Sequence, residues 1–244
     1  MFNFEIVIDS LPELAQAGWV TLQLLGVSLL AGLVVALPLG IARASDRRWL
    51  AWPVWCFTYV MRGTPMLVQL FLIYYGLAQF EFVRESMLWP WFSSAWFCAL
   101  LAFTLNTGAY TAEIIAGAIR ATPAGEVEAA RSLGMSAWRV MSRIVLPSAM
   151  RRALPAYSNE VIMMLHGTSL ASTVTIVDLT GAARELNART YLPFESFLAV
   201  ALIYLVLTFA LVGLFRLAER RWLRHLGPRQ TQPAAVGLAP SGAT

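Results

Sequence analysis

Residues 128–134 read Glu-Ala-Ala-Arg-Ser-Leu-Gly, and Ile144 and Leu146-Pro147 follow them. This segment is polar and rich in arginine, whereas the runs on either side of it are long and apolar. A helix that crosses a bilayer needs about 20 predominantly apolar residues, so the segment itself does not belong in lipid. We therefore expect it to lie in water, between two membrane helices.

The composition is typical of a membrane protein. Of the 244 residues, 58% are hydrophobic and 13% are charged, whereas soluble domains are about half apolar and about a quarter charged. The mean hydropathy is +0.63. All 18 basic residues are arginine, because the sequence contains no lysine. A phosphate-binding P-loop needs a lysine, so this chain is not a nucleotide hydrolase of the usual kind.

Five apolar runs are long enough to cross a bilayer. They lie approximately at residues 18–42, 53–78, 88–119, 154–177 and 194–217. The second run is interrupted by Arg-Gly-Thr-Pro at 62–65, and the fourth contains Asn-Glu at 159–160. Backbone groups in lipid must be paired within their own segment, and no run alternates as a barrel strand does. The sequence therefore predicts an all-α integral membrane protein with five transmembrane helices.

The arginines predict how the chain is oriented. Most of them fall in the first loop, the third loop and the C-terminal end, which all lie on one side of a five-span chain: Arg43, Arg47, Arg48, Arg120, Arg131, Arg139, Arg143, Arg151, Arg152, Arg216, Arg220, Arg221, Arg224 and Arg229. The opposite loops hold Arg84, Arg184 and Arg189. The positive-inside rule places the C-terminus and segment 128–134 in the cytoplasm and the N-terminus outside.

The domain organisation is simple. Residues 1–226 are expected to form one membrane domain, and residues 227–244, rich in Pro, Gly, Ala and Gln, are expected to form a disordered cytoplasmic tail. Cys56 and Cys98 have no metal-ligand spacing, so we expect neither a metal site nor a disulfide. The arginine excess follows the topology, and we expect no nucleic-acid partner. His166 and Ser169 lack an orienting acid and a nucleophile elbow, so no catalytic residue is predicted.

Glu160 is the candidate centre of a ligand site. Charged groups at bilayer depth are costly, and they usually face a cavity or a partner. Tyr157 and Met164 are expected on the same helical face as Glu160, at spacings of three and four. Together with Asn159, a buried carboxylate beside an amide and an aromatic ring suits a ligand that carries an ammonium, guanidinium or imidazolium group.

Other charged residues leave alternatives open. Arg62 precedes Gly63-Thr64-Pro65, where a helix would break and its freed backbone groups would line a cavity. Arg62 is then either part of a structural hinge or an arginine that faces a carboxylate. In the alternative interpretation of Glu160, Arg62 or Arg152 forms a permanent ion pair with it. Glu113, nearer the cytoplasmic end of its helix, is expected to pair with a loop arginine.

Several segments together resemble the permease subunits of polar amino-acid ABC importers. They are FTYVMRGTPMLVQ at 57–69, LNTGAYTAEIIAGAIR at 105–120, the region 123–147 around Glu-Ala-Ala, ALPAYSNEVIMMLH at 153–166 and AERRWL at 218–223. The likeness covers nearly the whole chain except about the last fifteen residues. It is strongest to the M-type membrane subunit of histidine/lysine/arginine/ornithine importers, and opine permeases are also similar.

The resemblance implies a type I ABC importer permease fold in the bacterial inner membrane. It implies four kinds of partner: a second homologous permease, two ATPase subunits, a periplasmic amino-acid-binding protein and the lipid bilayer. ATP and Mg²⁺ would be bound by the ATPase, so no cofactor is expected in this chain. The expected cargo is a basic amino acid (histidine, arginine, lysine or ornithine), with an opine or another polar amino acid as the alternative.

The resemblance and the residue patterns together give two predicted sites. Coupling to the ATPase is assigned to Glu128, Ala129, Ala130 and Gly134 in a cytoplasmic coupling helix. Substrate binding is assigned to Glu160, Asn159, Tyr157, Met164, Arg62 and Gln69. A competing function is a secondary transporter that works without ATP, for which the Glu-Ala-Ala segment would be accidental.

Overall fold

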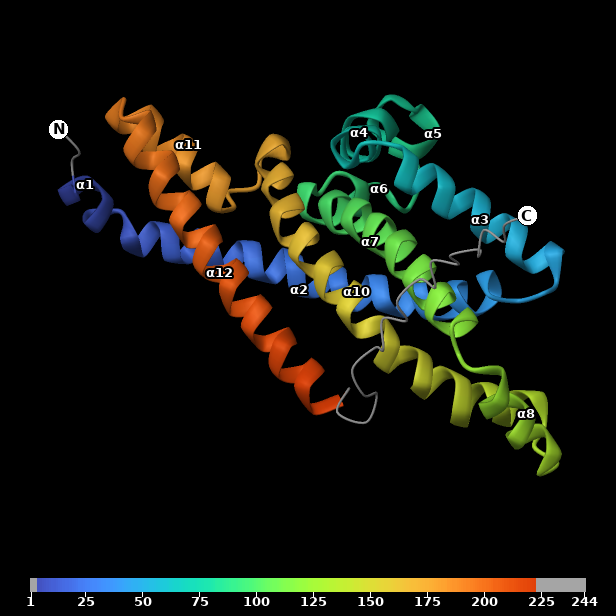
Figure 1. Ribbon diagram of the computed structural model, residues 1–244. Helices are drawn as coiled ribbons and strands as arrows, with labels where there is room; N and C mark the ends of the chain where they lie inside the picture. Colours follow the sequence, from blue (N-terminus) through green and yellow to red (C-terminus); the bar gives the residue numbers. More distant parts are fainter. Residues whose placement is uncertain (1–3, 223–244) are drawn as a thin grey trace, which may run out of the picture.

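The computed structural model describes residues 4–222, and every regular element in that range is a helix (Figure 1). Three helices are long and apolar enough to cross a membrane alone: α2 (Leu11–Arg43), α7 (Ala95–Arg120) and α12 (Pro193–Trp222). The expected tail at 227–244 lies outside the described residues, as do Arg224 and Arg229.

Two further spans are bent. The first joins α3 (Arg48–Gly63) to the stretch Met66–Gln79 at an angle of 103°, and the second joins Ala137–Val174 to α11 (Leu179–Thr190) at 49°. Counting each bent pair as one span gives five spans in the described part of the chain, in agreement with the five apolar runs. The fold is thus the expected all-α membrane bundle, and two of its spans are broken.

Shorter elements complete the chain. They are α1 (Phe4–Asp9), α4 (Met66–Phe71), the π-helical turn η1 (Leu72–Gly76), the 3₁₀ turn η2 (Leu77–Gln79), α5 (Glu81–Arg84), α6 (Trp89–Phe92), α8 (Ala124–Ser132), α9 (Ala137–Val140), the π-helical turn η3 (Met141–Val145), α10 (Leu146–Gly167) and the 3₁₀ segment η4 (Thr168–Val174). Figure 1 shows α8 at the end of the molecule remote from α1 and α11.

The helices α2 and α7 form the centre of the bundle, and α10 packs on α7. Gly40 of α2 lets the two central helices approach closely, because a Cβ atom there would lie 2.8 Å from the Cβ of Ile115 on α7. Small residues at helix contacts allow such packing in membranes, where burial from water does not drive association. Leu24, Phe103 and Leu165 are fully buried where α2, α7 and α10 meet.

The second span breaks where the sequence predicts. Pro65 has no N–H group to donate and disfavours a helical conformation at Thr64, which is extended with φ −114° and ψ 144°. The helix α3 therefore ends at Gly63, and α4 begins at Met66. The side chain of Gln69 closes the break, since its Nε2 atom donates to the carbonyl oxygens of Met61 (2.7 Å) and Thr64 (3.1 Å).

Candidate functional site

A cavity of about 640 Å³ lies between α7, α10 and the start of α4. Its lining is largely apolar and includes Met66, Met163 and Met164. Five polar residues also line it: Asn106 and Tyr110 from α7, and Asn159, Glu160 and His166 from α10. An apolar pocket with a few convergent polar groups is the usual form of a small-molecule site.

The cavity brings together half of the predicted substrate-binding residues. Glu160, Asn159 and Met164 line it, and Glu160 is 8% exposed. The helix α10 positions them: Glu160 and Met164 are four apart and share one helical face, and Asn159 is the residue next to Glu160, about 100° around the helix. A buried carboxylate within a largely apolar lining is the group that sets the charge preference of this cavity.

Tyr157, Arg62 and Gln69 do not line this cavity. The ring of Tyr157 packs edge-to-face against Phe215 of α12, with ring centroids 6.3 Å apart. Tyr157 lies about one turn before Glu160 on α10, and its ring is taken up there by the packing of α10 against α12. Its ring does not line the cavity, and its assignment to substrate binding stays a prediction.

Arg62 and Gln69 act one layer behind the cavity. The guanidinium of Arg62 stacks over the ring of Tyr110, 5.1 Å from its centroid, and Tyr110 lines the cavity. Gln69 is buried, and its Oε1 atom accepts a hydrogen bond from Asn106 Nδ2 at 3.0 Å. Both side chains contact residues that line the cavity, and their assignment to substrate binding stays a prediction.

Glu160 has no ion-pair partner among residues 4–222. Arg152, one of the two arginines considered for that role, instead donates to the carbonyl oxygen of Ala121 (2.6 Å) and to Glu126 (3.2 Å). Arg62, the other, is occupied by its stack on Tyr110. The permanent ion pair considered in the sequence analysis is therefore not formed in the described part of the chain.

The sequence analysis did not name Asn106 or Tyr110, although both lie in the quoted stretch 105–120. An asparagine in an apolar membrane run by itself indicates a position at a helix contact or a cavity, because polar groups in such runs usually find a polar partner or face a cavity. That indication does not say which helix Asn106 faces. Its position opposite Glu160 depends on how α7 packs against α10.

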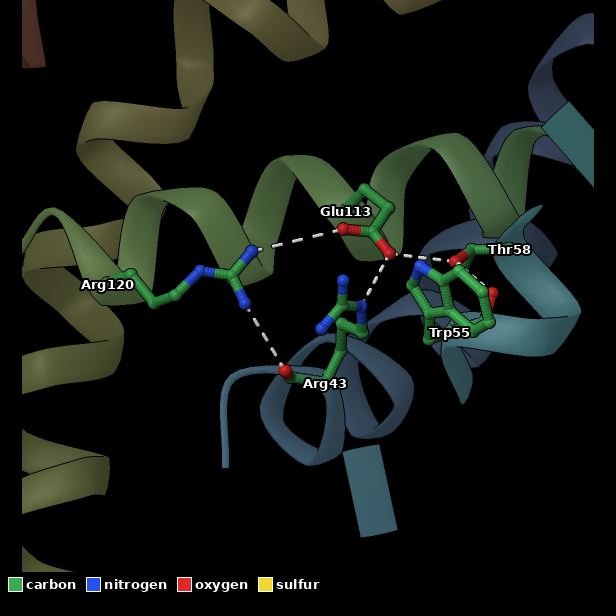
Figure 2. A network of polar contacts seen from close by, with 5 residues as sticks. All are labelled: Arg43, Trp55, Thr58, Glu113 and Arg120. Carbon is green, nitrogen blue, oxygen red and sulfur yellow. Dashed lines mark hydrogen bonds and ion pairs between the residues drawn. The ribbon is translucent and has the colours of Figure 1, made fainter. Parts of the chain in front are cut away.

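Glu113 anchors a separate polar network at the end of α7 (Figure 2). Its Oε1 atom accepts from Arg43 Nε of α2 and from Thr58 Oγ1 of α3, both at 2.7 Å. Arg120 lies 3.9 Å from the other carboxylate oxygen and also donates to the carbonyl oxygen of Arg43 at 3.3 Å. The expected pairing of Glu113 with a loop arginine is confirmed, and the network ties three helices together.

The predicted coupling segment forms a helix and a sharp turn. Glu128, Ala129 and Ala130 lie in α8, which ends at Ser132. Gly134 follows with φ +75°, its N–H bonds the carbonyl oxygen of Arg131, and the N–H of Met135 bonds that of Ala130. These are the two hydrogen bonds of a Schellman motif, which needs a residue in the left-handed conformation. Gly134 is therefore the glycine that stops the helix.

The segment around this turn exposes large apolar side chains. Leu133 is 82% exposed and Trp138 is 73% exposed. They stand in a polar, arginine-rich region outside the apolar runs, where lipid tails do not cover them. An exposed apolar group within a polar surround is typical of a protein-binding surface.

A bundle of apolar helices around a largely apolar cavity with a few convergent polar groups, together with a polar helix outside its spans, is typical of a permease of a membrane transport system. The profile of one family, described as the binding-protein-dependent transport system inner membrane component, matches residues 28–224. The chain belongs to this family. It is accordingly an inner-membrane transport subunit and not the subunit that hydrolyses ATP.

Individual relatives agree with that family. The chain is 51% identical to the histidine/lysine/arginine/ornithine transport system permease protein HisM of Escherichia coli (strain K12), over 87% of this chain and 90% of that protein. It is 46% identical to the nopaline transport system permease protein NocM of Agrobacterium fabrum, over 99% of this chain and 98% of that one. The resemblance stated from the motifs is confirmed.

Solved structures confirm the fold. A crystal structure of an amino acid ABC transporter with histidines matches with a TM-score of 0.80 and 33% identity, over 91% of this chain and 99% of that one. The methionine transporter MetNI in an inward-facing conformation matches with a TM-score of 0.73 at 18% identity, which shows the fold alone. The chain has the type I ABC importer permease fold.

Proposed function

We propose that this chain is the membrane-spanning permease subunit of an ATP-driven importer of basic amino acids: histidine, arginine, lysine and ornithine. The observation that carries the cargo assignment is Glu160, a buried carboxylate in the cavity with no ion-pair partner in residues 4–222. A cation in the cavity would supply the missing partner, and a charge pair in low dielectric is strongly discriminating. The similarity to HisM supports the same cargo class.

The proposed assembly contains a second homologous permease, two ATPase subunits and a periplasmic amino-acid-binding protein. The family description names dependence on a binding protein, and the matched ABC transporter structures belong to ATP-driven systems. ATP and Mg²⁺ belong to the ATPase subunits. The coupling contact with the ATPase is assigned to Glu128, Ala129, Ala130 and Gly134, beside the exposed Leu133.

The reconstituted complex tests the cargo. We expect proteoliposomes with the permeases, the ATPase and the binding protein to take up labelled arginine in an ATP-dependent way. Unlabelled lysine, ornithine and histidine should compete, and glutamine, which is polar but uncharged, should not. The similarity to NocM makes nopaline the second candidate cargo, and stronger competition by nopaline than by every amino acid tested would favour it. Uptake without ATP would favour the secondary-transporter alternative.

We also propose that the N-terminus faces the periplasm and the C-terminus the cytoplasm, from the arginine asymmetry. Single cysteines at Glu81 or Glu85 should then react with a membrane-impermeant thiol reagent added outside spheroplasts. Single cysteines at Asp46 or Arg48 should react only after the membrane is permeabilised. Cys56 and Cys98 need replacement by serine first. Labelling at positions 46 and 48 from outside would reverse the assignment.

A further inference from the structure

Gln69 joins the break between α3 and α4 to the cavity-lining helix α7. It is 7% exposed. Its Nε2 atom contacts three oxygens on the α3 side: the carbonyl of Met61 at 2.7 Å, the carbonyl of Thr64 at 3.1 Å and the hydroxyl of Thr64 at 2.7 Å. Its Oε1 atom accepts from Asn106 Nδ2 at 3.0 Å. Both ends of this carboxamide are therefore engaged.

These partners allow one orientation of the Gln69 carboxamide. Backbone carbonyl oxygens only accept hydrogen bonds, so the nitrogen of Gln69 must face Met61 and Thr64. The Thr64 hydroxyl donates its own hydrogen to the carbonyl of Val60 at 2.8 Å and is thus also an acceptor toward Gln69. The oxygen of Gln69 is left facing α7.

The orientation of Gln69 in turn fixes that of Asn106. An acceptor at Gln69 Oε1 requires a donor opposite it, so Asn106 must present its NH₂ group there. The same nitrogen approaches the carbonyl oxygen of Met61 at 3.5 Å, which agrees with this choice. The oxygen Oδ1 of Asn106 points away from both, and no donor within residues 4–222 bonds to it. Asn106 lines the cavity that contains Glu160.

We propose that Gln69 is a positioning residue, which orients Asn106 so that its carbonyl oxygen, and not its NH₂ group, is offered to the cavity. The cavity then presents two acceptors, the Glu160 carboxylate and Asn106 Oδ1. Two acceptors suit a cationic group with several N–H donors, such as a guanidinium. Neither Glu160 nor Asn106 then offers a donor to the oxygen of a neutral ureido or carboxamide group placed between them. The inference rests on the proposed function, because it takes this cavity as the ligand site.

The test compares arginine with citrulline, its neutral ureido analogue, in direct binding to the purified permease–ATPase complex without the binding protein. In Gln69→Leu the Asn106 carboxamide is free to rotate and to donate to the citrulline oxygen. We expect the ratio of the citrulline Kd to the arginine Kd to fall up to about tenfold, which corresponds to the upper end of the net contribution of one neutral hydrogen bond. An unchanged ratio would overturn the proposal.

Thr64→Val is the matched control. It removes one of the hydrogen bonds of Gln69 at the same break and leaves the bond to Asn106 in place. The ratio of the two Kd values should stay as in the wild type. An equal fall in Thr64→Val would assign the effect to the break itself and overturn the role of Gln69.

Two further variants keep the outcome interpretable. If Gln69→Leu does not assemble, Asn106→Ala removes the oriented oxygen and leaves Gln69 bonded to α3, and the ratio should fall by a similar factor. A wild-type ratio in Asn106→Ala would then overturn the proposal. If Glu160→Gln binds arginine as the wild type does, the proposed ligand site itself fails. If Glu160→Gln weakens arginine binding while Gln69→Leu leaves the ratio of the citrulline Kd to the arginine Kd unchanged, only the positioning role of Gln69 fails.

Discussion

Glu160→Gln is expected to reduce the uptake of arginine, lysine and protonated histidine on the order of a hundredfold, because it deletes one member of a buried charge pair. The substitution keeps the shape of the side chain and removes its charge. Burial of the carboxylate offsets much of the attraction it offers a cation, so the loss appears chiefly as lost discrimination against neutral ligands. Initial uptake rates in proteoliposomes measure this effect. The loaded binding protein is supplied on the side of the membrane that the periplasmic face of the reconstituted complex faces.

Glu113→Gln is the matched control for that experiment. Glu113 is another carboxylate held between the membrane helices, with its side chain 16% exposed, but it is engaged by Arg43 and Thr58 and does not line the cavity. Its loss should lower the thermal stability of the complex and leave the preference for cationic over neutral amino acids unchanged. Wild-type uptake of cations by Glu160→Gln would show that Glu160 has a structural role.

ATPase stimulation separates binding from assembly in the Glu160 variant. We expect the loaded binding protein to signal through the outer loops of the permease and not through the cavity. Stimulated ATP hydrolysis should therefore persist in Glu160→Gln while transport falls. Loss of both activities together would indicate a misassembled complex, which size-exclusion chromatography of the purified complex detects.

Gly134→Glu is expected to abolish transport and weaken ATPase association while the permease remains in the membrane. Gly134 has φ +75°, so any side chain there adds a backbone cost of about 1–2 kcal/mol for the left-handed conformation. The substitution also places a charge beside the exposed Leu133, at the proposed contact with the ATPase. Co-purification of the ATPase with a tagged permease measures association, and uptake measures coupling.

Two variants at the same position separate the backbone effect from the contact. Gly134→Asn tolerates the left-handed conformation and carries no charge, so it should retain most of the association. Gly134→Ala carries the backbone cost without the charge and should be intermediate. Nothing lies within 4 Å of the position that a Cβ atom would take at residue 134. A Cβ atom there therefore meets no steric clash within the permease, and the three variants can be compared directly. Normal stimulated uptake by Gly134→Glu would remove the coupling role from this turn.

The polar clasp beside α8 was not predictable from the sequence. Arg152 of α10 caps the end of α7 at Ala121 and pairs with Glu126 of α8, which Ser148 also contacts at 3.3 Å. The sequence analysis had considered Arg152 only as a partner for Glu160. The two residues are eight apart on one helix, a rise of about 12 Å, which is beyond the reach of a direct ion pair. The contact that forms instead depends on where the chain returns after α7.

The sequence by itself determined the class and the spans of this protein, and it marked residues 128–134 as the candidate coupling segment. Each of these follows from a property that is local along the chain. Apolar length decides whether a segment crosses lipid, Pro65 decides where the second span breaks, and Gly134 supplies the left-handed turn after α8. The position of Glu160 in an apolar run was likewise enough to mark it as the candidate centre of a ligand site.

Only the tertiary structure decided which side chains share the cavity with Glu160. Asn106 and Tyr110 line it from α7, the ring of Tyr157 packs against α12, and Gln69 contacts Asn106. These placements depend on the rotation and spacing of whole helices. That geometry is set by the packing of many side chains between helices far apart in the sequence, and helical periodicity within one segment does not contain it.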